Sequence, residues 1–314
     1  MSDVIGIGRR TGPFLADPVH VVHVDPEDIA GDLVAVFDMV KYHVDRDGQI
    51  LMVFPDRLAP EIETPLRIVR SSLGARGVLM HATTLPPLAA DVLMTLLAAV
   101  RPQVPNVAAL AAALPMLEQQ ILHFTWLSSV AGLTHPAPSV GQHARSLLPG
   151  GSWMVRSWPE LAVERFDLSK PFEVPRASQE VGVALADLDG DRSWIDPLVG
   201  THIANPVSVE VEPSADARTW WGCDRVAQLV LYPRDIDRVV SALAGVLDIG
   251  RCRWCGETVG SATCPWCRLP RGGMPLGQNI TSGAAAEEQV ATWDPTGDTG
   301  PAVAAQQHME RTQG

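Results

Sequence analysis

The chain has 314 residues, of which 46% are hydrophobic, and its 24 basic and 36 acidic side chains give a formal net charge of −12. This length and apolar content suit one large domain or two ordinary ones with a sizeable core. The acidic balance argues against sequence-independent nucleic-acid binding by the whole body, because it repels phosphate backbones.

The first half of the chain alternates short apolar runs with helical patterns. The β-branched run at 19–24 precedes a stretch at 25–44 that starts with Asp25 as a helix N-cap and carries an apolar stripe at helical spacing. Continuous apolar runs follow at 50–54 and 78–82, as expected of buried strands. The order strand, helix, strand predicts βαβ units.

The second half has a different pattern. After a stretch at 107–130 that is mostly helical in pattern, four short strands are predicted, at 153–158, 181–186, 207–212 and 227–232. The clean alternation at 207–212 is typical of a strand with one wet face, so these strands look more antiparallel than those of the first half. We expect an α/β fold with a mixed sheet and flanking helices.

Four of the five cysteines lie within residues 251–270, as Cys252, Cys255, Cys264 and Cys267. Two thiolates three positions apart in a tight turn can bind one metal ion from the same side, and the eight-residue spacer is long enough for a hairpin that brings the second pair onto the first. Four sulfurs at tetrahedral geometry predict one closed, structural Zn²⁺ site with no open position for catalysis.

This segment resembles the short zinc-ribbon modules found at the ends of bacterial proteins, and the resemblance covers residues 252–267 only. The resemblance implies zinc binding, and it leaves open whether the module contacts DNA, RNA or protein. The alternative is redox chemistry, since CPWC is similar to a glutaredoxin-type active site. That chemistry needs a helix after the motif, and the residues after Cys267 cannot continue one.

Arginine and tryptophan surround the cysteines and are candidate contact residues: Arg251, Arg253, Trp254, Trp266 and Arg268. The tryptophans can close a small core over the hairpin or contact a protein partner. Arginine beside exposed tryptophan can also bind single-stranded nucleic acid, which the acidic chain as a whole disfavours.

These patterns divide the chain into four parts. Residues 1–150 form an α/β domain, 151–249 a second α/β part that can be continuous with the first, 250–270 the zinc ribbon, and 271–314 a disordered tail rich in glycine and proline. The first residues are polar and do not resemble a signal peptide. The number of cysteines is odd and four of them are clustered, which disfavours disulfides. We therefore expect a cytosolic bacterial protein without a membrane segment.

Other motifs are weaker. The stretch GIGRRTG at 6–12 is superficially like a phosphate-binding glycine loop but lacks the strand–turn–helix context. A cleft lined by Asp56, Arg57, His81 and Thr83 would favour an enzyme acting at the ends of parallel strands. No catalytic residue is assigned.

The expected function is a cytosolic, non-enzymatic adaptor or assembly component that makes protein contacts through its α/β body and zinc ribbon. Two alternatives remain open. One is an enzyme acting on a nucleotide or phosphate substrate, and the other is a nucleic-acid-binding regulator that works through the ribbon arginines.

Overall fold

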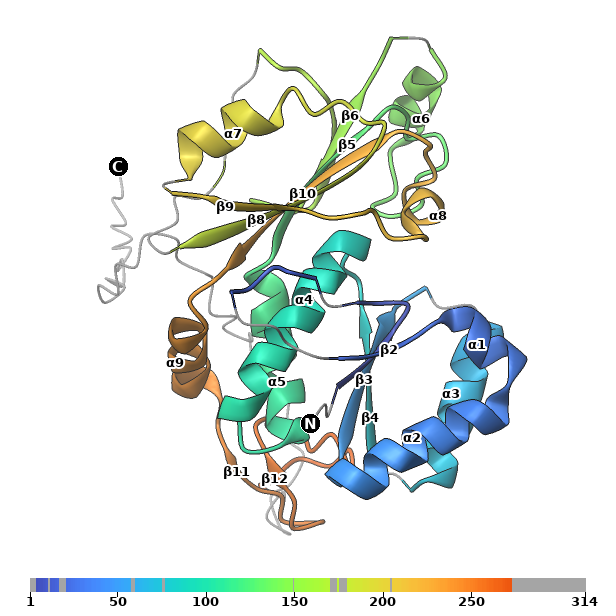
Figure 1. Cartoon of the computed structure of the whole chain (residues 1–314), viewed down its shortest axis with the longest axis vertical. Coiled ribbons are helices and arrows are strands. Elements are labelled where there is room, and N and C mark those ends of the chain that lie inside the picture. The colour runs from blue at the N-terminus through green and yellow to red at the C-terminus, as the bar shows by residue number, and fades with distance from the viewer. Residues whose placement is uncertain are drawn as a thin grey trace, which may run out of the picture.

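The computed structural model of the chain describes residues 4–10, 12–16, 21–57, 60–74, 77–148, 150–169, 174, 180–203 and 205–272. It confirms the expected α/β class, with two helix-flanked sheets and a small two-stranded piece at the cysteine cluster (Figure 1). The tail predicted at 271–314 lies outside the described residues from position 273 onward. None of the described helices is both long and apolar enough to cross a membrane.

The first sheet consists of four parallel strands in the order β2-β1-β3-β4. The strands are β1 (Val4–Ile7), β2 (Val22–Val24), β3 (Ile50–Pro55) and β4 (Val78–Thr83). The inner strands β1 and β3 are buried along their whole length, as parallel strands covered on both faces must be.

Helices cover both faces of this sheet (Figure 1). They are α1 (Pro26–Gly31), α2 (Leu33–Asp47) and α3 (Pro60–Ser72) on one face, and α4 (Pro87–Val100) and α5 (Val107–Gln119) on the other. Side chains of β3 alternate between these two layers: Met52 packs with α2 and α3, whereas Leu51 and Val53 pack with α4 and α5.

The second sheet has six strands in the order β7-β6-β5-β10-β8-β9, and only the pair β8–β9 is parallel. The strands are β5 (Leu122–Leu127), β6 (Trp153–Arg156), β7 (Ala162–Arg165), β8 (Val181–Leu188), β9 (Val207–Glu210) and β10 (Val226–Pro233). The division of the body at residue 150 stays a prediction.

Strand β5 lies in a stretch that helical periodicity had predicted to be mostly helix. Helix α5 ends at Gln119, and the residues of β5 are then all buried between neighbouring strands. A continuous apolar run has no period of its own, so its pattern does not separate a buried strand from a buried helix.

The second sheet carries its own helices: α6 (Val140–Ser146), α7 (Ile195–His202) and α8 (Ala217–Trp221), and the chain then continues into α9 (Ile236–Val246). Strand β10 is one of the two central strands, and its side chains alternate between the two faces. Leu229 and Leu231 pack with Trp194 and the α7 layer, while Val230 and Tyr232 pack with α4.

Helix α4 therefore lies between the two sheets (Figure 1). Most of its side chains are buried on every side, including Leu93, Leu96 and Leu97, which are 0% exposed. An all-round apolar helix of this kind is stable only when other elements cover its whole circumference, so α4 couples the two halves of the body.

A close backbone contact fixes two loops of the second half to each other. Gly132 follows β5, and Gly222 ends α8 in the left-handed conformation with a φ of 58°. A Cβ atom added at Gly222 would come within 2.2 Å of the carbonyl oxygen of Gly132. Neither backbone can move away without displacing its loop, so only glycine fits here.

We expect Gly222→Ala to lower the free energy of unfolding by more than about 2 kcal/mol, because it adds both left-handed strain and a backbone clash. Gly245→Ala is the matched control, since it lies in α9 with nothing within 4 Å of the added Cβ. Urea unfolding of both variants measures the effect. Equal or higher stability of Gly222→Ala would show that the two loops are not held together as described.

Candidate ligand cavities and cysteine cluster

The carboxyl ends of the parallel strands face the second sheet. The loops after β1 and β3 contact residues of the second half, as Arg9 pairs with Asp216 and Arg57 donates a hydrogen bond to Thr134. In an open parallel sheet, the crevice outside the carboxyl ends at the point where strand order reverses is the preferred place for ligands. The order β2-β1-β3-β4 reverses at β1 and β3, next to these contacts.

The first cavity lies at this junction and has a volume of about 400 Å³. It lies between the loop after β4, the start of β5 and the loops of the second half. Its apolar lining residues are Leu85, Pro86, Ile121, Leu122, Pro136, Trp158, Pro159, Leu161, Trp220 and Trp221. A mostly apolar cavity of this size with a few polar groups is typical of a small-molecule site.

His123 and Glu118 are two of the polar residues that line this cavity. His123 is 6% exposed and its Nδ1 has no hydrogen-bond partner among the described residues. Burial lowers the pKa of His123 to about 4, so its imidazole is neutral at physiological pH. Glu118 Oε1 accepts a 2.7 Å hydrogen bond from Thr83 Oγ1 and lies 3.2 Å from His81 Nε2. Thr83 and His81 at the end of β4 therefore fix the position of the Glu118 side chain.

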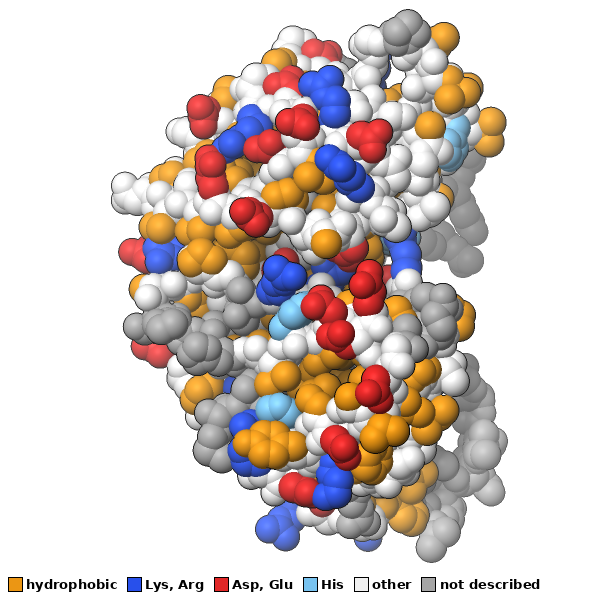
Figure 2. Space-filling model, turned by 45° about the vertical axis from the view of Figure 1, so that its right-hand side comes forward, with side chains coloured by type: hydrophobic (Ala, Val, Ile, Leu, Met, Phe, Trp, Pro, Cys, Tyr) orange, Lys and Arg blue, Asp and Glu red, His pale blue; other side chains and the backbone are white. Residues whose placement is uncertain are grey.

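The second cavity, of about 340 Å³, lies beside the first. The two share Trp220, and the guanidinium of Arg57 lies 4.6 Å from the centre of a Trp220 ring. The other lining residues are Gly8, Arg9, Arg10, His23, Asp25, Pro26, Pro55, Ile62, Thr134, Ser214, Ala215, Asp216 and Thr219. Charged side chains and one histidine gather at the level where the two halves meet (Figure 2).

Arg9 is the least exposed charged residue of this cavity, at 0% exposure. Its Nη2 donates a 2.5 Å hydrogen bond to Asp216, whereas its Nε and Nη1 have no partner among the described residues. His23 lies 2.7 Å from the backbone oxygen of Arg9 and 3.0 Å from Asp25. Behind the cavity, burial raises the pKa of Asp91 to about 6 although Arg9 opposes this.

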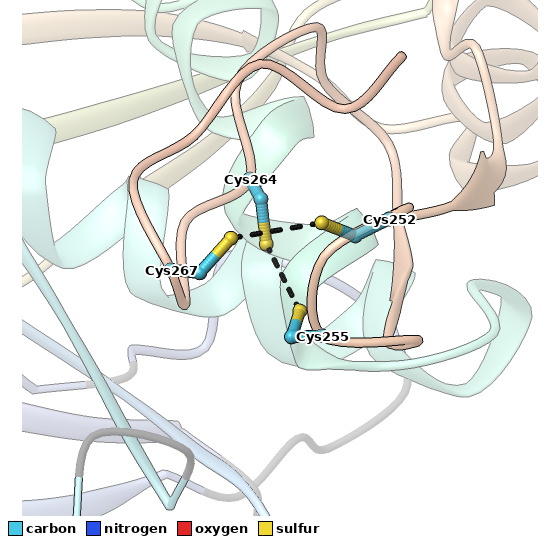
Figure 3. Close-up of side chains that lie close together, drawn as sticks. All are labelled: Cys252, Cys255, Cys264 and Cys267. Atoms are coloured by element: carbon cyan, nitrogen blue, oxygen red, sulfur yellow. Dashed lines mark hydrogen bonds between the residues drawn. The ribbon is translucent and has the colours of Figure 1, made fainter. Parts of the chain in front are cut away.

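The four cysteines come together at the opposite end of the first sheet, as the sequence predicted (Figure 3). Their sulfur atoms all lie within 4.8 Å of one another, and the pairs Cys252–Cys267 and Cys255–Cys264 are each 3.6 Å apart. A sulfur tetrahedron around a zinc ion has edges of about 3.8 Å, given Zn–S bonds of about 2.3 Å. This donor set can hold one metal ion.

The two cysteine pairs have the same backbone geometry. Gly256 donates to the Cys252 oxygen and Arg268 to the Cys264 oxygen, each at 2.9 Å, and both donors have a positive φ. Burial opposes ionisation of Cys252, but the backbone N–H groups of Cys255 and Trp254 lower its pKa to about 6. Amides that point at sulfur stabilise thiolates, the form that binds metal.

The ribbon packs on the body. It includes β11 (Gly250–Arg251) and β12 (Thr258–Val259), and Asn106 at the start of α5 donates a 2.8 Å hydrogen bond to the Thr258 oxygen. Trp266 is 4% exposed within the α4–α5 core, whereas Trp254 is 59% exposed. The two tryptophans, placed alike in the sequence, therefore have different environments.

The arginines around the cysteines lie on the surface. Arg251, Arg253 and Arg268 are exposed. The pKa of Arg70 in α3 is lowered mainly by its burial. The positive charge of nearby Arg268 lowers it further. Their role in contacts with a partner stays a prediction for these three arginines.

No family model and no curated protein matches this chain in sequence. Solved structures do match its body. A DegV family protein from Corynebacterium glutamicum has a TM-score of 0.54 at 10% identity, with 74% of this chain and 96% of that chain covered. A fatty acid binding DegV family protein from Streptococcus agalactiae has a TM-score of 0.52 at 10% identity, covering 75% and 99%.

A third similar structure is the fatty acid kinase B3 protein of Streptococcus pneumoniae loaded with linoleic acid, with a TM-score of 0.50 at 10% identity and a coverage of 74% and 99%. At this identity the likeness shows the fold, which is that of the DegV proteins. About a quarter of the chain lies outside each match.

These comparisons contradict the expected function. The body has the fold of the DegV proteins, and two of the similar structures are described as fatty acid binding or as loaded with a fatty acid, not as generic adaptors or nucleic-acid regulators. The adaptor function was inferred mainly from the zinc ribbon, because that segment carries the strongest local sequence motif. The predicted cleft also differs: His81 and Thr83 hold Glu118, and Arg57 faces the second cavity.

Sequence reasoning missed the cavities because their walls come from distant segments. Leu85, Ile121, Trp158 and Trp220 belong to four separate segments of the chain, the last of them in α8. One signal was present. The stretch 6–12 was set aside as a phosphate loop, and the described residues 12–16 after it form no helix, yet the stretch supplies three residues of the second cavity.

The neutral state of His123 makes the stability of the protein sensitive to acid. An unfolded histidine titrates near 6.5, so between about pH 6.5 and 4 the unfolded state binds a proton that folded His123 does not. The free energy of unfolding therefore falls as the pH falls through this window. We expect His123→Asn to lose roughly 2–3 kcal/mol less than the natural protein between pH 7.5 and 4.

Urea unfolding at the two pH values measures this difference, with His143→Asn as the control at a partly exposed histidine of α6. Apart from His123 and His143, the titrating groups are common to the three proteins and cancel in the comparison. An identical pH slope in His123→Asn and the natural protein would show that His123 is not buried in the neutral form.

Proposed function

We propose that the chain binds a fatty acid, or an amphiphile of the same shape, with the acyl chain in the first cavity. The observation that carries the proposal is a largely apolar cavity of about 400 Å³ at the junction of the two sheets. The same fold in proteins described as fatty acid binding supports it.

The walls of the first cavity suit an acyl chain. Leu122 and Ile121 are buried at its base, and the rings of Trp158, Trp220 and Trp221 provide apolar faces around it. An acyl chain that moves from water into such a site gains about 0.8 kcal/mol for each buried CH₂ group. The neutral imidazole of His123 adds little desolvation cost, because it is uncharged before the ligand arrives.

The polar end of the ligand has a different set of neighbours. Thr84 and His135 line the cavity and are less buried than its base, so they lie on the side open to water. Thr83 and His81 fix the Glu118 oxygen in place, and because two carboxylates repel each other the ligand carboxylate would lie away from it. A fatty acid would then lie with its chain toward Ile121 and its carboxylate toward Thr84.

We expect Leu85→Trp to weaken binding of a long-chain fatty acid at least about tenfold, because the larger side chain fills part of the cavity. Leu85 is only partly buried, so the variant can fold. Leu148→Trp is the matched control at an exposed leucine that does not line the cavity. Titration of delipidated protein with saturated fatty acids gives the affinities.

The same titration tests the physical origin of the affinity. Each added CH₂ group that fits the cavity should tighten binding about fourfold, which corresponds to about 0.8 kcal/mol. Binding that is indifferent to chain length, or equal in Leu85→Trp and Leu148→Trp, would rule out the first cavity as the acyl-chain site.

We further propose that the four cysteines hold one structural Zn²⁺. Four closely spaced thiolates with amide groups directed at sulfur are the donor set that zinc prefers in closed sites. The zinc would supply no chemistry to the cavities, and its effect would be to hold the ribbon folded against α5. The free thiols fit a reducing compartment, so the cytosolic location is part of this proposal. A protein partner stays a prediction.

Purified protein should contain one zinc per chain, and Cys264→Ser should lower that content at least about tenfold because it removes a ligand from a closed site. Its melting temperature should fall as well, since Val259 and Trp266 then lose their support on α5. Cys223→Ser is the control, because Cys223 is buried elsewhere, beside Ser128. Equal zinc content in the two variants would contradict the site.

A further inference from the structure

The ribbon carries an exposed surface at the point where the described chain ends. Trp254 is 59% exposed and Leu269 is 41% exposed, although both are large apolar side chains. Arg253 and Arg268 are their neighbours in the sequence and are exposed as well. We call these four residues the exit surface. Neither cavity includes any of them, so the proposed acyl-chain site does not account for this surface.

Hydrogen bonds hold the end of the described chain against the exit surface. The indole N–H of Trp254 donates to the Pro270 oxygen, and Arg253 Nη1 donates to the Gly272 oxygen, each at 3.2 Å. The chain therefore continues into residue 273 directly beside Arg253 and Trp254. Whatever follows in the sequence starts next to this surface.

The positive charges of the exit surface are unpaired within the described part of the chain. Arg253 and Arg268 have no ion-pair partner among the described residues, and Arg268 also lies near the positive charge of Arg70. Glu257 is the one acidic side chain between positions 250 and 272. Tryptophan and arginine are the residues most enriched where proteins bind one another. This surface is thus suited to an acidic chain that carries an aromatic side chain.

The sequence that follows has this complementary composition. Residues 273–314 contain five acidic side chains and one basic side chain. Four of the acidic residues lie within 284–298, AAAEEQVATWDPTGD, together with Trp293, which is the one aromatic residue after position 272. The intervening residues 273–283 span at most about 40 Å. The segment 284–298 can therefore reach the exit surface.

We propose that residues 284–298 bind to the exit surface of the same chain. Trp293 contacts Trp254 and Leu269, and the acidic side chains of the segment face the two arginines. Exposed ion pairs contribute little alone, so the aromatic contact is the anchor and the charges select the partner. A short connection gives an effective concentration on the order of mM, so a contact too weak to join separate molecules is populated within one chain. An acidic chain from outside then has to displace this segment.

Fluorescence anisotropy of a labelled peptide with the sequence of residues 284–298 tests the proposal on the full-length protein. In the natural chain the attached segment competes with the peptide, so reversing the charges of that segment frees the exit surface. We expect the Glu287→Lys/Glu288→Lys double variant to bind the peptide at least about tenfold more tightly than the natural chain. Glu310→Lys reverses a charge outside the segment and should leave the peptide affinity unchanged.

Further substitutions in the double variant locate the bound peptide. Trp254→Ala should weaken peptide binding at least about tenfold, because it removes the apolar anchor. Arg268→Gln should weaken it about threefold, as expected for one exposed charge. The Arg268 side chain makes no hydrogen bond with the described residues, so this variant keeps the ribbon folded even if Trp254→Ala releases Pro270. Arg145→Gln, at an exposed arginine of α6, is the control that should have no effect.

Three results would overturn the proposal. Equal peptide affinity of the natural chain and the double variant would mean that the chain's own segment does not cover the exit surface, which would then be open to another acidic chain. A peptide that binds neither protein, or that binds regardless of Trp254→Ala and Arg268→Gln, would place no acidic segment on this surface. A natural chain that sediments as a dimer, and becomes a monomer in the double variant, would assign the segment to a second copy.

Discussion

The structure depends on the burial of α4 on all of its sides. This helix has an apolar surface around its whole circumference, and each of its neighbours covers one part: the first sheet, α5, and the inner face of β8 and β10. A helix of this composition cannot face water, so the two sheets must stay on either side of it. The loop at its start, which carries Thr84 and Leu85, is consequently held at the junction where both cavities lie.

The two cavities share a wall but differ in chemistry. Trp220 lies between them, with the guanidinium of Arg57 stacked 4.6 Å from its ring. On one side of this pair the lining is apolar, and on the other it carries three arginines. The close contact of Gly132 with Gly222 fixes the end of α8, which carries Trp220, against the loop that carries Thr134. Small changes in those loops would therefore alter both cavities at once.

The sequence predicted those features that depend on neighbours along the chain. The strand–helix alternation of the first half and the approach of Cys252 to Cys267 follow from local periodicity and spacing, and the structure has both. The stretch 122–127 was assigned to helix because continuous apolar runs have no distinguishing period. The cavities were not predictable, since Leu85, Trp158 and Trp220 meet only through the fold, and the strong motif of the ribbon drew the functional expectation away from them.

The central claim is that an acyl chain occupies the first cavity, and the most direct measurement is a crystal structure with 12-bromododecanoic acid. The anomalous signal of bromine marks the end of the chain independently of any model of the ligand. The account predicts one bromine site among Ile121, Leu122 and Trp158, with the carboxylate toward Thr84. A bromine found outside the first cavity, or none at ligand concentrations that saturate binding in solution, would contradict it.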